Sequence, residues 1–105
     1  MKVYEFKKDS GTGFSYVFEK NLAPGEEFVV KMPAVSANKR GINDIGWLTD
    51  GDVTLKATLA KDPRSEEALW QEINNNDEIN KVTSAVKIKN NGNSKCRIEM
   101  RAILN

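Results

Sequence analysis

The fold class of this chain is decided by the stretch Lys95-Cys96-Arg97-Ile98-Glu99-Met100-Arg101-Ala102-Ile103-Leu104. One side of the stretch is apolar (Cys96, Ile98, Met100, Ala102, Leu104), and the other carries Lys95, Arg97, Glu99 and Arg101. Because successive side chains of a strand point to opposite faces, this period of two predicts a half-buried β-strand. Upstream, Val82, Ser84, Val86 and Ile88 share one face, and the polar run from Asn90 to Asn93 follows. We therefore expect a terminal β-hairpin from Glu78 to Leu104.

Similar alternation recurs in shorter segments that are separated by turn-forming residues. Strands are expected over 3–6, 14–18, 27–32, 45–49 and 53–60, and Phe14, Tyr16 and Phe18 form an aromatic stripe typical of a core face. Pro24-Gly25 predicts a turn, and Asp50-Gly51 predicts a type I′ hairpin turn, which needs a positive φ. About eight short strands predict an all-β, two-layer antiparallel β-sandwich of jelly-roll or immunoglobulin-like type, as a single domain over 1–105.

The composition argues against several classes of partner. With 16 basic and 15 acidic residues in 105, the net charge is +1 and the signs are interspersed, so no field favours nucleic acid or an anionic membrane. A single cysteine allows no internal disulfide, which favours a reducing cytosol. Met1 to Lys8 does not resemble a signal peptide, and no apolar run reaches the roughly 20 residues of a membrane span.

Candidate chemistry is sparse. The chain has no histidine, which removes the commonest general base and metal ligand. Cys96 lies on an apolar strand face and is expected in the core. The closest carboxylate pairs are Asp50 with Asp52 and Glu66 with Glu67, but the Asp50-Gly51-Asp52 run reads as a turn and lacks the spacing of a calcium loop. We expect no catalytic residues, no metal and no cofactor.

Two kinds of surface site remain open. Trp47 and Trp70 are candidate stacking residues for sugar rings, although packing in the core is the alternative for each. Lys39 and Arg40, in an expected loop over 34–44, and Ile103, an apolar residue on the charged face of the last strand, are candidate protein-contact residues. The first strand, Lys2 to Phe6, could pair with a neighbouring chain.

The C-terminal half carries a resemblance. Leu69-Trp70-Gln71-Glu72-Ile73, the run from Asp77 to Ile88, the Asn/Gly turn and the final Ala102-Ile103-Leu104-Asn105 resemble small β-sandwich virion proteins of tailed bacteriophages, and the stretch from Trp47 to Leu59 is similar to them too. The resemblance brings no site residues.

The resemblance implies a virion structural protein, assembled in the bacterial host cytoplasm. Such a protein decorates the capsid or forms part of the head or tail, contacts the major capsid protein or other virion proteins, and often forms a homo-oligomer such as a trimer. A carbohydrate-binding β-sandwich module of an adsorption or tail apparatus is the alternative function, with Trp47 or Trp70 as the stacking face and asparagines of the Asn74 to Asn76 loop as hydrogen-bonding partners.

Overall fold

A computed structural model describes residues 1–9, 15–33, 42–58, 69–75 and 77–104 of the chain. Within these ranges there is no helix, and hence none that could cross a membrane. The strands are β1 (Val3–Glu5), β2 (Lys7–Lys8), β3 (Ser15–Leu22), β4 (Glu27–Lys31), β5 (Ile42–Thr49), β6 (Val53–Thr58), β7 (Gln71–Ile73), β8 (Asp77–Thr83), β9 (Ala85–Asn90) and β10 (Cys96–Leu104).

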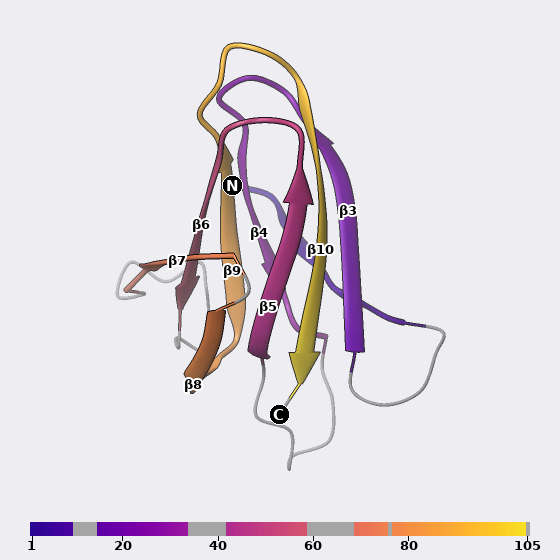
Figure 1. Ribbon diagram of the computed structural model, residues 1–105, viewed down its shortest axis with the longest axis vertical. Coiled ribbons are helices and arrows are strands. Elements are labelled where there is room, and N and C mark those ends of the chain that lie inside the picture. The colour runs from indigo at the N-terminus through magenta and orange to yellow at the C-terminus, as the bar shows by residue number, and fades with distance from the viewer. Residues whose placement is uncertain (10–14, 34–41, 59–68, 76, 105) are drawn as a thin grey trace.

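The strands form two sheets that pack face to face (Figure 1). One sheet has the order β1-β4-β9-β6-β7, and the other has the order β2-β3-β10-β5-β8. The expected all-β sandwich is confirmed. The described residues form ten strands and not eight, in part because two expected strands are each divided where the chain passes to the other sheet: at Phe6, between β1 and β2, and at Ser84, between β8 and β9.

The strand pairing identifies the sandwich as a jelly roll rather than an immunoglobulin-like fold. β3 pairs with β10, β4 with β9, β5 with β8 and β6 with β7, all antiparallel, so the chain from β3 to β10 is one long ribbon folded back on itself. The ribbon then wraps round, because β10 also pairs with β5, and β9 with β6. This rolled ribbon of eight strands is the jelly-roll arrangement.

The two predicted hairpins are wrong. β9 pairs only with β4 and β6, and β10 pairs only with β3 and β5, so the turn at 90–93 joins strands of different sheets. The Asp50-Gly51 turn likewise connects β5 of one sheet with β6 of the other. Alternating strands joined by Asn, Asp and Gly are compatible with a hairpin within one sheet and with a turn between two sheets. In both arrangements one face of each strand packs on the core.

Gly51 is required for a reason that the turn prediction did not give. Its φ is not positive, whereas that of Gly25 is 74°. Instead, Gly51 lies directly against β10, where a methyl group on its Cα would overlap the Cβ of Cys96 and lie 2.9 Å from its Sγ. The glycine therefore allows the β5–β6 turn to close over Cys96.

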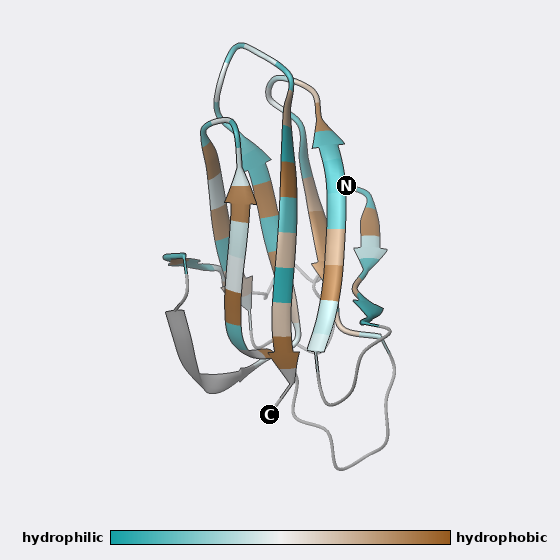
Figure 2. Cartoon of the chain, turned by 45° about the vertical axis from the view of Figure 1, so that its right-hand side comes forward, coloured by the Kyte–Doolittle hydropathy of each residue, from teal (hydrophilic) through white to brown (hydrophobic). Residues whose placement is uncertain are grey.

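The core lies between the two sheets and is built from their inward-facing residues. Figure 2 shows the alternation of apolar and polar residues along the strands that produces it. Cys96 is buried, as expected, and of the aromatic stripe Tyr16 is buried and Phe18 packs against the core. Phe14 is outside the described residues. The N-terminal segment closes one side: β1 pairs in parallel with β4, β2 pairs with β3, and the buried Phe6 lies between them.

The polar side chain of Asn90 is fully buried at the end of β9. Its Nδ2 donates hydrogen bonds to the carbonyl oxygens of Leu22 (3.3 Å), Ala23 (3.2 Å) and Ser94 (3.0 Å), and its Oδ1 accepts one from the N–H of Gly92 (2.9 Å). Its backbone N–H and C=O bond to the β3–β4 turn as well. Asn90 thus ties together two connections between the sheets.

Replacing Asn90 by alanine is expected to destabilise the protein by about 2–4 kcal/mol, because it leaves several partly buried carbonyl groups without a donor. The measurement is urea unfolding followed by tryptophan fluorescence. Asn93→Ala changes an exposed asparagine of the same turn and serves as the control, with an expected change within about 0.5 kcal/mol. Equal midpoints for the two variants would contradict the role given to Asn90.

Gly51→Ala is expected to cost about 1–3 kcal/mol, since the new methyl group must displace the backbone-attached Cβ of Cys96. Gly92→Ala is the matched control. There the added Cβ meets nothing closer than the Asn90 Oδ1 at 3.4 Å, and the φ is not positive, so stability should change by less than about 1 kcal/mol. Thermal unfolding of both variants measures the difference; a Gly51→Ala protein as stable as the wild type would refute the close approach.

Candidate functional site

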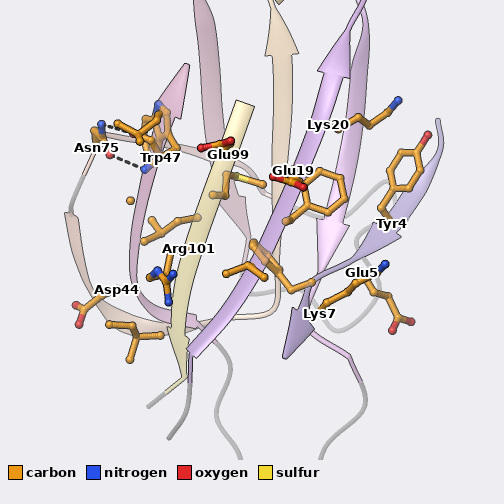
Figure 3. A pocket seen from close by; sticks show the side chains of 18 residues that line it. Tyr4, Glu5, Lys7, Glu19, Lys20, Asp44, Trp47, Asn75, Glu99 and Arg101 are labelled. Carbon is orange, nitrogen blue, oxygen red and sulfur yellow. Dashed lines mark hydrogen bonds between the residues drawn. The ribbon is translucent and has the colours of Figure 1, made fainter. Parts of the chain in front are cut away.

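A concavity extends over the outer face of the sheet β2-β3-β10-β5-β8 and to Tyr4, Glu5 and Phe6 of the N-terminal segment. Side chains from β3, β10 and β5 line it, and Figure 3 shows Glu19, Glu99, Arg101, Trp47 and Asn75 around it. The register places the outward residues in rows across the three central strands: Glu19, Glu99 and Leu48 form one row, and Val17, Arg101 and Gly46 form the next. This outward surface of β3, β10 and β5 is called the outer face below.

The charged groups on the β3 side of the outer face pair with one another. Arg97 lies 2.9 Å from Glu19 and 3.7 Å from Glu99. Arg101 donates to Asp9 at 2.6 Å and to the Ser15 hydroxyl at 2.8 Å. Exposed pairs of this kind add little stability, generally below about 1 kcal/mol. Their main effect is to hold the arginines toward β3, which leaves the β5 side apolar.

The β5 side of the outer face combines an exposed leucine with a hollow. Leu48 is 72% exposed and Ile103 is 43% exposed, which places Ile103 at the surface as its sequence position indicates. Along β5, Gly46, which has no side chain, lies between Leu48 and Asp44, the register partner of Ile103. Because residues two apart on a strand are about 7 Å apart on the same face, the leucine stands beside a position that has no side chain.

Asp44 completes this side of the outer face. It pairs across β5 and β10 with Ile103, and its Oδ1 is buried without a hydrogen-bond partner among the described residues. A buried carboxylate oxygen without a donor is unfavourable by at least about 1–3 kcal/mol relative to a bonded one. This oxygen therefore lies beneath the outer face and not on it.

Asn75 holds the free edge of β5 beside the outer face. Its Oδ1 accepts a hydrogen bond from the Trp47 N–H, and its Nδ2 donates one to the Trp47 carbonyl oxygen, both at 2.8 Å (Figure 3). The amide thus replaces a strand residue at a point that β8 does not reach, since β8 pairs with β5 only at Ile42, Asp44 and Ile45. Both polar atoms of Asn75 are used in this way.

The two tryptophans proposed for sugar stacking lie in different places. Trp47 is half-buried and packs against the core, in line with the core alternative. Trp70 precedes β7, in the other sheet, and the Lys87 Nζ lies 4.3 Å from the centre of its ring. The structure does not bring the two rings into one platform, and Asn75 is engaged with the backbone of Trp47.

The remaining candidates from the sequence fall in two groups. Asp50 is part of the β5–β6 turn, where its Oδ1 accepts a hydrogen bond from the Arg97 N–H at 2.8 Å, and Asp52 is exposed. Lys39, Arg40, Glu66 and Glu67 lie outside the described residues. Among the residues that the structure does describe, no three acidic, cysteine or histidine side chains gather as a metal site would require.

Sequence reasoning missed Leu48, Gly46 and Asp44, and it expected Asn75 to bond to a sugar and not to the backbone of β5. For Leu48 a signal was present in the sequence. Ile45 and Trp47 share the core side of β5, so the alternation places the apolar Leu48 on the outward side, as it places Ile103 in β10. Nothing in the sequence indicated that Asn75 would bond to β5.

Comparison with known proteins gave no match to a family model, to a curated protein or to a solved structure.

Asn75→Ala is expected to speed hydrogen exchange at the Trp47 amide by about fivefold to tenfold, because the loss of one hydrogen bond of about 1 kcal/mol opens this edge of β5. Asn75→Asp retains an oxygen acceptor for that amide and should exchange more slowly than Asn75→Ala. NMR-detected exchange measures both, with the Ile88 amide in the other sheet as the internal control. An unchanged Trp47 rate in Asn75→Ala would show that the bond does not protect this edge.

Proposed function

We propose that the chain is a non-enzymatic structural protein of a bacteriophage virion, which acts through protein–protein contacts as a capsid decoration or cement protein. The proposal joins the resemblance of the C-terminal half to small phage virion proteins with the surface of the sandwich. Jelly rolls occur in viral capsid proteins and also in lectins, so the fold is compatible with both proposed classes and selects neither.

The observation that carries the proposal is the kind of apolar side chain that the described surface exposes. The large exposed apolar residues are Met1, Leu48, Leu69 and Ile103, all aliphatic. Every described aromatic side chain is buried or half-buried. Sugar rings stack on exposed aromatic faces, whereas aliphatic side chains fill the apolar centres of protein interfaces. The surface therefore favours a protein partner.

The edges of the sandwich are less suited to contact with a protein partner than its faces are. Four strands lie at sheet edges, and three of them (β1, β2 and β7) have only two or three residues. Short edge strands are a common protection against pairing with other chains. Contacts through the outer face and through Leu69 thus fit the described chain better than addition of a strand at Lys2 to Phe6.

The alternative function, a carbohydrate-binding module, has weaker support. It needs a tryptophan face open to the ligand and asparagine amides free to bond to hydroxyl groups. Trp47 packs against the core, Trp70 has Lys87 over its ring, and both polar atoms of Asn75 bind the Trp47 backbone. Each of these groups would have to be released before a sugar could use it.

The test is detection of the chain in phage particles. Antibodies raised against the purified protein are used on particles released from the bacterial strain that carries the gene and purified through a caesium chloride gradient. We expect the chain to sediment with the particles and immunogold labels to mark their surface. A host cytosolic enzyme serves as the marker for carry-over. Particles without the chain, from a lysate that contains it, would overturn the proposal.

A further inference from the structure

The outer face has a shape and a charge pattern that complement themselves. On β5, the exposed Leu48 and the side-chain-free Gly46 lie two residues apart on the same face. On β10, their neighbours in the register are Glu99, beside Leu48, and Arg101, beside Gly46. The protruding Leu48 thus lies next to an acidic residue, and the hollow at Gly46 lies next to a basic one.

We infer that the outer face binds a second copy of this chain across a two-fold axis. The axis runs between the two facing sheets, perpendicular to their strands, at the level of the register pair Trp47–Met100. The interface is isologous, so the same surface contributes from both copies. The inference rests on the proposed function in one respect, namely that the outer face is a protein-contact surface.

The position of the axis follows from the register. Rotation about this axis reverses the strand direction. β5 of one copy therefore lies over β5 of the second copy and antiparallel to it, and β10 lies over β10 in the same way. Each Leu48 then lies over Gly46 of the second copy, and each Glu99 faces Arg101 of the second copy. An axis one residue away in either direction would set Glu99 against Glu99, or Arg101 against Arg101, which like-charge repulsion disfavours. One position therefore satisfies both the shape and the charges.

The same axis also brings a basic residue to the level of Asp44. Asp44 and Ile103 lie three residues from the axis level along their strands, and Arg97 lies three residues away in the opposite direction on β10. The rotation brings Arg97 of the second copy to the level of Asp44. Its guanidinium has five N–H donors, and only some of them are occupied by Glu19 and Glu99. An acidic residue of one copy and a basic residue of the other then stand at the same level, which adds to the charge complementarity.

Sedimentation velocity of the purified full chain over a concentration series tests the inference, without any virion partner. We expect the wild type to form a dimer, and Leu48→Glu to raise the dimer dissociation constant by about tenfold or more, since a charge would enter the hollow over Gly46. Leu69→Glu is the matched control. It introduces the same charge at a leucine that is 85% exposed next to β7, in the other sheet, and should leave the dimer unchanged.

A second pair of variants tests the axis itself. Gly46→Leu alone fills the hollow and should weaken the dimer, whereas the double variant Gly46→Leu/Leu48→Gly exchanges protrusion and hollow and should restore it, because the two-fold axis relates these positions to each other. A wild type that is monomeric throughout, a closed trimer, or a dimer that Leu69→Glu but not Leu48→Glu weakens would overturn the inference. None of these results affects detection of the chain in particles, so the two proposals fail separately.

Discussion

The structure depends on how the chain crosses from one sheet to the other, and the side chain of Asn90 secures two of these crossings at once. Consecutive strands from β3 to β6 and from β7 to β10 alternate between the sheets, so each connection must span the thickness of the core. Backbone groups in such connections lose water without gaining a ladder partner. The buried amide of Asn90 supplies partners to both the β3–β4 and the β9–β10 connection, which fixes where the sheets end relative to each other.

The outer face shows how the charges of a sheet surface can expose its apolar residues. Arg97 and Arg101 are drawn toward β3 by Glu19, Asp9 and Ser15. Long arginine stems often cover apolar neighbours, but here they lean away from β5. Leu48 therefore remains open, and Gly46 leaves the hollow beside it. The ion pairs matter less for stability than for the distribution of apolar surface.

The sequence was sufficient to predict where strands form, but it was not sufficient to predict which strands pair. The two-residue period of β10 and the turn residues around Pro24 and Gly25 predicted local structure that the chain adopts. Pairing was mispredicted at Asp50-Gly51 and at 90–93, because a turn between sheets and a hairpin turn use the same residues. Asn90 was read as a turn residue, although it continues the buried face of Val86 and Ile88. The Asn75 bond and the contact of Gly51 with Cys96 join segments distant in sequence, which no local pattern reveals.

The central place of β10 has a consequence for how the protein is made. β10 lies between β3 and β5, so it supplies the middle of its sheet, yet it is the last of the ten described strands to be synthesised. A nascent chain that ends at β9 has β3 and β5 with no strand between them. The ribosome must therefore release β10 before this sheet can close, and the earlier strands wait with their apolar faces uncovered. Long-range pairing of this kind also slows folding. The interval between synthesis and closure is thus the period in which uncovered apolar strand faces are most prone to aggregation.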